Sequence, residues 1–127
     1  MNIIDSSGWL EYFADGPNAL FFSQPLRKTA ELIVPTITIY EVFKTVLRQR
    51  DESDALQAIA LMQQGSVVDL TANISILAAK ISLEHNMPMA DSIILATGHL
   101  YQATIWTQDS DFEGIEGVRY VPAQFKG

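Results

Sequence analysis

Short apolar runs separated by helix-forming segments are the feature that most limits how this chain can fold. The runs cover residues 2–4, 32–34, 67–68, 105–106 and 118–121. They lack the two-residue alternation of a half-exposed strand, which is typical of strands buried on both faces of a parallel sheet. We therefore predict an α/β fold with a parallel β-sheet of about five strands flanked by helices.

The segments between these runs have helical spacing. In the segment after the second run, apolar residues recur at positions 39, 42, 43, 46 and 47, the pattern of one helix face. We expect further helices after Asp5, around residues 20–22, over 53–64, over 74–86 and over 88–101. Each helix that follows a strand begins at the carboxyl end of that strand, where the functional sites of open α/β sheets lie.

Length and composition place limits on the protein class. With 127 residues, 48% of them hydrophobic, the chain fits a single domain covering 1–127. It has no cysteine, which excludes disulfides and thiolate metal sites, and no apolar run long enough to span a membrane. We expect a soluble cytoplasmic protein. The net charge of −7 argues against tight nucleic-acid binding by the chain alone, whereas clustered acids suit a divalent cation.

Five acidic residues fall where a site is expected. Asp5 and Asp109 come just after the first and fourth predicted strands, and Asp111 follows two residues later. Glu41 is placed in the first turn of the helix after the second strand, and Asp91 in the first turn of the helix that begins at Pro88. Asp91 joins the others only if its helix also begins at that sheet edge, which the sequence alone leaves open.

Each acid also has a purely structural explanation. Asp5 suits a helix N-cap, and Thr38 with Glu41 has the spacing of a capping box. Asp91 is favoured by the helix dipole, and Asp109 suits an Asx-turn. Glu41 also has Lys44 and Arg48 on its helix face, where solvated ion pairs are ordinary.

Taken together, the acids favour a metal site. Carboxylates that converge on one sheet edge repel one another unless a cation neutralises them. All-oxygen ligands point to Mg²⁺ or Mn²⁺, which also bind phosphate oxygens. Such ions can activate water and stabilise the leaving oxygen in phosphodiester hydrolysis.

Four motifs together resemble the PIN-domain family over nearly the whole chain. They are Asp5-Ser6-Ser7, Thr38-x-x-Glu41, Ala90-Asp91-Ser92-Ile93-Ile94-Leu95-Ala96 and Thr107-Gln108-Asp109-Ser110-Asp111-Phe112. The last two are the most specific. The resemblance implies a PIN-like fold in which Asp5, Glu41, Asp91 and Asp109 are catalytic. The same four residues and Asp111 would hold Mg²⁺ or Mn²⁺.

The resemblance also implies an activity and partners. The reaction would be cleavage of single-stranded RNA. The single-domain length resembles VapC-type toxins, which pair with a VapB-type antitoxin and form homodimers. Gln108 is a departure, because many relatives carry a basic residue at that position.

Two alternative functions remain open. A receiver-type phosphoacceptor domain would use Asp69 after the third strand, but it needs an acidic pair after the first strand and a lysine near the fifth, and both are missing. A PIN-like domain retained only for binding would not need the full set of acids. Among the other residues, we expect His85 to interact with a helix C-terminus and His99 to have no chemical role.

The aromatic pair Phe21-Phe22 bears on partner binding. Two adjacent side chains on a helix do not both face straight inward, so one of them is a candidate for a partner surface, and packing of both in the core explains the pair equally well. Lys44 and Arg48 are candidates for contact with RNA phosphates, although a solvated helix face explains them equally well.

Overall fold

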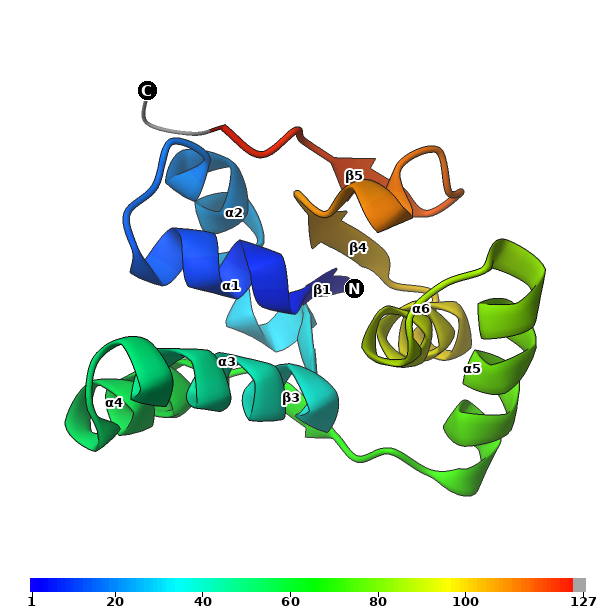
Figure 1. Ribbon diagram of the computed structural model, residues 1–127, viewed down its shortest axis with the longest axis horizontal. Helices are drawn as coiled ribbons and strands as arrows, with labels where there is room; N and C mark the ends of the chain where they lie inside the picture. The colour runs from blue at the N-terminus through cyan, green and yellow to red at the C-terminus, as the bar shows by residue number, and fades with distance from the viewer. Residues whose placement is uncertain (125–127) are drawn as a thin grey trace.

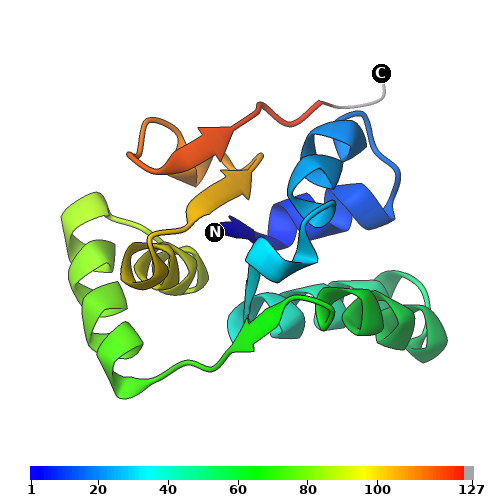
Figure 2. The same cartoon turned by 180° about the vertical axis from the view of Figure 1, so that it is seen from behind.

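A computed structural model describes residues 1–124, and it contains a five-stranded parallel sheet. The strand order is β3-β2-β1-β4-β5, with β1 at the centre and β3 and β5 at opposite edges (Figure 2). The strands are β1 (Asn2–Ile4), β2 (Leu32–Pro35), β3 (Ser66–Val68), β4 (Thr104–Thr107) and β5 (Val118–Tyr120). The predicted fold class is confirmed.

Six α-helices cover the sheet. They are α1 (Ser6–Phe13), α2 (Ala19–Leu26), α3 (Thr36–Gln49), α4 (Glu52–Met62), α5 (Ala72–His85) and α6 (Met89–Tyr101). Short 3-10 turns, η1 (Thr29–Glu31) and η2 (Ser110–Phe112), precede β2 and follow β4. Figure 1 shows α1 to α4 on one side of the sheet and α5 and α6 on the other.

Both faces of the sheet are buried, because successive strand residues point to opposite sides. Ile3, Ile33 and Ile105 pack into the core beneath α5 and α6. Ile4 and Trp106 pack into the second core, with the helices on the other side of the sheet. The continuous apolar runs in the sequence follow from this arrangement, since each central strand contributes to two cores.

The start of α3 differs from the expectation. Pro35 ends β2 and is also the N-cap of α3, which therefore begins at Thr36. Glu41 lies in the second turn rather than the first. The Thr38 hydroxyl donates a 2.7 Å hydrogen bond back to the carbonyl of Pro35, and α3 has no side-chain N-cap bond. The capping-box explanation for Glu41 is therefore wrong.

Phe21 and Phe22 are both packed inside the protein. Phe22 is fully buried, and Phe21 is half-buried with its ring centroid 5.0 Å from that of Trp106. The exposed apolar residue of α2 is Leu20 instead. This packing gives no support to a partner surface at Phe21 or Phe22.

The topology argues against the receiver alternative. Asp69 follows β3, an edge strand that β2 separates from β1. It therefore comes after the strand furthest from β4 and its acidic residues. Over residues 1–124, no helix is long and apolar enough to cross a membrane.

Candidate metal centre

Two neighbouring central strands bring the first acids together. β1 pairs in parallel with β4, with Ile4 opposite Trp106. The backbone N–H of Asp5 then continues the ladder with a 3.1 Å hydrogen bond to the carbonyl of Trp106. Asp5 and Asp109 therefore emerge at the same carboxyl edge of the sheet, as the sequence predicts.

The tightest acidic group joins α6 to the turn after β4. One carboxylate oxygen from each of Asp91, Asp109 and Asp111 lies within 4.8 Å of the other two. Asp91 is in the first turn of α6, so this helix does begin at the site edge. Asp109 is the N-cap of η2, and its Oδ1 accepts a 2.9 Å hydrogen bond from the backbone N–H of Asp111. The Asp109 side chain therefore caps η2 and belongs to the carboxylate group at the same time.

Asp5, which follows the neighbouring strand β1, is buried, with only 2% of its surface exposed. Its Oδ1 accepts a 2.9 Å bond from the Gly8 backbone as the N-cap of α1. Its Oδ2 accepts a 2.6 Å bond from the Thr107 hydroxyl. The Ser7 hydroxyl lies 2.7 and 2.9 Å from the two oxygens but has one hydrogen to donate. A carboxylate has about four lone-pair sites, so one remains for a further ligand.

Burial and mutual repulsion raise the pKa of two of these acids. Burial raises the pKa of Asp5 to about 6, although hydrogen bonds from Thr107, Ser7 and Gly8 partly offset the effect. Burial, the charge of Asp109, and a hydrogen bond with Asp111 raise the pKa of Asp91 to about 8. The negative charge of Asp5 acts on Asp91 in the same direction. The site thus concentrates more negative charge than its own hydrogen bonds stabilise.

Glu41 contacts α1 and not the group of three aspartates. The hydroxyl of Ser6, which directly follows Asp5, donates a 2.6 Å hydrogen bond to Glu41 Oε1. Over residues 1–124 the ion pairs are Lys28–Glu31 and Arg50–Asp54, so Glu41 has no salt bridge with Lys44 or Arg48. Glu41 is not within the 4.8 Å group of three aspartates and lies on the α1 side of the site.

These residues fit a hard divalent cation. The donors are carboxylate oxygens, the ligands preferred by Mg²⁺ and Mn²⁺. A cation would offset the repulsion that raises the pKa of Asp91. Asp91, Asp109 and Asp111 are the residues closest to one another, and Asp5 interacts electrostatically with the first two.

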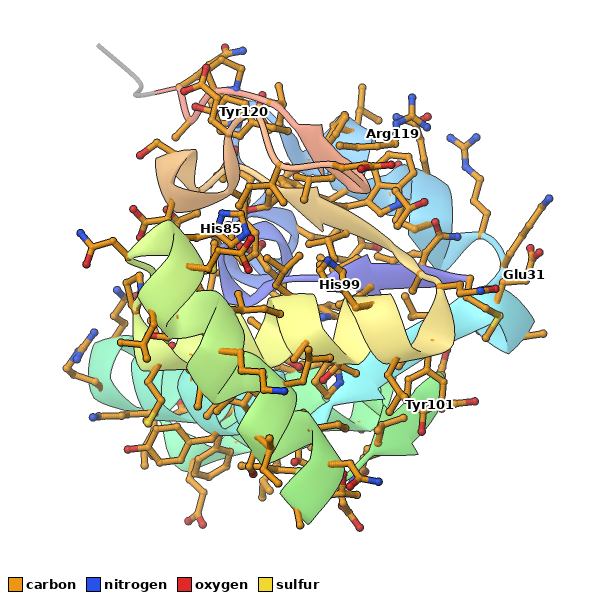
Figure 3. The ribbon with its side chains drawn as sticks, turned by 90° about the vertical axis from the view of Figure 1, so that its right-hand side faces the viewer. Glu31, His85, His99, Tyr101, Arg119 and Tyr120 are labelled. Carbon is orange, nitrogen blue, oxygen red and sulfur yellow. The ribbon has the colours of Figure 1, made fainter. Side chains whose placement is uncertain are left out.

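The histidines lie outside this group. His85 ends α5 and His99 lies on α6, and both are exposed (Figure 3).

The exposed Lys44 places its ammonium group 5.6 Å from the ring centroid of Tyr40.

Three hydroxyl groups belong to the site although the sequence did not assign them a role there. Ser6 holds Glu41, while Ser7 and Thr107 hold Asp5. In the sequence, Ser6 and Ser7 suit a helix start, which hides their second role. Thr107 stands two residues before Asp109 at the end of an apolar strand, and this position is the signal that could have identified it.

The fold and the carboxylate cluster define the class of protein: a parallel α/β domain with an acidic centre at the carboxyl edge of its sheet. The family model of the PIN domain matches residues 3–118, so the chain belongs to the PIN-domain family. The resemblance seen in the four motifs is thereby confirmed. No curated protein matches the chain.

Several solved structures share the fold. A toxin–antitoxin complex from Klebsiella pneumoniae contains a chain that is 21% identical, with a TM-score of 0.80 over 98% of this chain and 100% of that one. VapC20 of Mycobacterium tuberculosis, described as a toxin that cleaves the sarcin–ricin loop, is 14% identical, with a TM-score of 0.77 over 91% and 95%. A chain of a DNA-bound VapBC complex from Salmonella typhimurium is 17% identical, with a TM-score of 0.75 over 96% of this chain and 98% of that one.

Proposed function

We propose that this protein is a Mg²⁺- or Mn²⁺-dependent endoribonuclease and the toxin of a VapBC-type pair. The observation that carries the proposal is the approach of one carboxylate oxygen from each of Asp91, Asp109 and Asp111 to within 4.8 Å of the others, with the buried Asp5 close enough to interact electrostatically with Asp91 and Asp109. Membership of the PIN-domain family and the likeness to toxin structures support it.

Each acid has a proposed role in hydrolysis of an RNA phosphodiester bond. Asp91 and Asp109, with Asp111, would hold the cation, and Asp5 would complete the set. When bound, the cation supplies a Lewis acid that activates water and stabilises the charge developing on the phosphate. Thr107 and Ser7 orient the Asp5 carboxylate and keep it ionised, because their hydrogen bonds lower its pKa. Glu41, which accepts a hydrogen bond from Ser6, would be a further ligand of the cation.

RNA binding has to overcome the acidic net charge of −7. Gln108 does not help, because its side chain is bonded to Asn18. We assign phosphate contact to Lys44 and Arg48, which are exposed on α3 on the same side as Glu41. Two basic side chains provide only a weak, sequence-independent affinity for RNA. We therefore expect this chain to recognise RNA by its shape as well as by its charge.

We further propose a VapB-type antitoxin as partner, a homodimer as the assembly and the cytoplasm as the location. A groove of about 500 Å³ runs between α1, the end of α3 and α4. Its lining includes Leu10, Phe13, Val46 and Leu61. An apolar helix of the antitoxin would occupy it, and basic residues on that partner would match the acidic charge of this chain.

The test is cleavage of single-stranded RNA by the purified chain with Mn²⁺ or with EDTA. We expect cleavage only with the metal, and we expect Asp91→Asn and Asp109→Asn to lose at least a hundredfold in rate while remaining folded. Ser110→Ala, an exposed neighbour in η2, is the matched control. Metal-independent cleavage, or full activity in both aspartate variants, would refute the proposal. Binding of RNA without cleavage would favour the alternative of a PIN-like binding module.

A further inference from the structure

Asn18 is the N-cap residue of α2, but its side chain does not cap the helix. Asparagine is favoured at N-caps because its side-chain oxygen accepts a hydrogen bond from the first turn. Here no such bond forms, and the residue is 5% exposed. Helix capping therefore does not explain why a polar amide is buried at this position.

The amide of Asn18 instead bonds to two segments that are distant in sequence. Its Nδ2 donates to Gln108 Oε1 at 3.0 Å and to the carbonyl of Pro122 at 2.9 Å. Its Oδ1 accepts from Gln124 Nε2 at 3.3 Å. The C-terminal segment thus passes over the connection between α1 and α2, as Figure 1 shows.

The orientation of the amide follows from the chemistry of its partners. A backbone carbonyl can only accept, so the group facing Pro122 must be the Asn18 NH₂. Gln108 must then present its oxygen to the second hydrogen of that NH₂. Both hydrogens of the Asn18 NH₂ group are therefore used, and its oxygen accepts one bond from Gln124.

Gln108 is the residue that connects Asn18 to the acidic site. It stands between Thr107, which bonds to Asp5, and Asp109, which belongs to the carboxylate group. Its backbone N–H donates to the Ser7 hydroxyl at 3.4 Å, and that of Asp109 donates to the Thr107 hydroxyl at 2.9 Å. Repulsion among the carboxylates tends to push the Asp109 turn outward. The 3.0 Å Asn18–Gln108 bond restrains this turn through the residue that precedes Asp109.

We propose that Asn18 is a positioning residue for the acidic site and acts through Gln108. By holding the side chain between Thr107 and Asp109, it fixes Asp109 relative to Asp5 and so sets the affinity of the site for a divalent cation. The 2.9 Å bond to the Pro122 carbonyl keeps the Asn18 amide oriented, and this bond remains when Gln124 is replaced. This inference rests on the proposed function for its metal readout, but not for its structural readout.

The experiment uses the full chain with four variants: Asn18→Leu, Gln108→Met, the double variant and Gln124→Ala. The first two remove opposite ends of the same hydrogen bond without adding charge. Gln124→Ala is the control, because it disturbs Asn18 while leaving the bond to Gln108 intact. The measurements are the Mn²⁺ concentration at half-maximal thermal stabilisation, kcat and KM for single-stranded RNA, and amide hydrogen exchange at residues 108 and 109 without metal.

We expect Asn18→Leu and Gln108→Met each to raise the half-maximal Mn²⁺ concentration about tenfold. We expect kcat to fall at a fixed Mn²⁺ concentration with KM within twofold. The double variant should be no worse than either single variant, because both lose the same contact. Amide protection at residues 108 and 109 should fall in these variants and not in Gln124→Ala. If Asn18→Leu does not fold, Gln108→Met carries the same test.

Unchanged exchange and unchanged Mn²⁺ response in a folded Asn18→Leu or Gln108→Met protein would overturn the inference. An equal loss of Mn²⁺ affinity and amide protection in Gln124→Ala would also overturn it. The losses would then come from any disturbance of the buried amide and not from the bond to Gln108. If the unaltered protein neither responds to Mn²⁺ nor cleaves RNA, the proposed function fails, and the exchange data alone decide whether Asn18 positions the turn.

Discussion

The Thr107 hydroxyl donates a 2.6 Å hydrogen bond to Asp5 Oδ2 and accepts a 2.9 Å bond from the backbone N–H of Asp109. One side chain thus joins the buried acid after β1 to the exposed acidic turn after β4. Its methyl group lies in a fully buried position, so the hydroxyl is held in a single place. The relative position of Asp5 and Asp109 depends on this residue.

Replacing Thr107 with valine should therefore weaken metal binding at neutral pH. The Thr107 bond lowers the pKa of Asp5, which burial raises to about 6. Without it the pKa of Asp5 rises further, and protons compete with the cation over a higher pH range. We expect the pH midpoint of Mn²⁺ binding to increase by about one unit in Thr107→Val and to stay unchanged in Thr107→Ser. Identical pH profiles in the three proteins would show that the hydroxyl has no such role.

The raised pKa of Asp91 predicts how the metal-free protein responds to pH. Its pKa is about 8 in the folded state, against an ordinary value of about 4. Between these values the folded state binds more protons than the unfolded state, so stability falls as pH rises. The stabilising effect is complete below about pH 4 and is lost as pH passes about 8.

Thermal melts in EDTA between pH 5 and 9 provide the measurement. We expect Tm to fall with pH, and to fall less steeply in Asp91→Asn, with a difference of about 5 °C or more by pH 9. With Mn²⁺ the order should reverse, because the asparagine variant gains little from the metal. If Tm in EDTA falls equally steeply with pH in Asp91→Asn and in the unaltered protein, the pKa of Asp91 is not raised in the folded state.

Much of this arrangement could be predicted from local sequence patterns. The residues of each strand are continuous in sequence, and so are those of the Asp91 segment and of the Thr107–Phe112 segment. Their structure depends on local patterns or on burial in a parallel sheet, and both can be recognised in a single sequence. That β1 and β4 are neighbours is a matter of topology, but the carboxyl edge of the sheet is shared by all parallel strands. The sequence therefore places Asp5 and Asp109 on the same edge, whereas their meeting depends on β1 and β4 being neighbours in the sheet.

Other parts depend on contacts that no local pattern reveals. Thr38 and Glu41 have the spacing of a capping box, yet the N-cap is Pro35, three residues before Thr38. Asn18 suits a turn or a cap, and its partners lie 90 to 106 residues further along the chain. Buried amides that bind distant segments are set by tertiary packing, which a single sequence does not display.

Glu41 should be important for cleavage and nearly irrelevant to stability. It does not cap α3, and its hydrogen-bond partner is Ser6 across the α1–α3 interface. Glu41→Gln can still accept that bond but is a poor ligand for a hard cation. We expect a shift in Tm of no more than about 2 °C in EDTA and a loss of RNA cleavage of at least a hundredfold. Ser6→Ala should show a smaller loss of about tenfold, because it frees Glu41 without removing its charge. A fully active Glu41→Gln protein would exclude Glu41 from the site.

The groove between α1 and α4 predicts where a neutralising partner binds. Leu61 is half-buried in its lining, so a charge there would disturb an apolar contact with a partner while leaving the protein folded. We expect Leu61→Glu to retain RNA cleavage and to lose at least tenfold in affinity for the cognate antitoxin, measured by titration of cleavage. Leu83→Glu is the matched control, because Leu83 is 88% exposed on α5, on the other side of the sheet. Phe21→Ser should instead lower stability, since Phe21 packs against Trp106. A folded Leu61→Glu protein that the antitoxin inhibits as well as the unaltered protein would place the partner surface elsewhere.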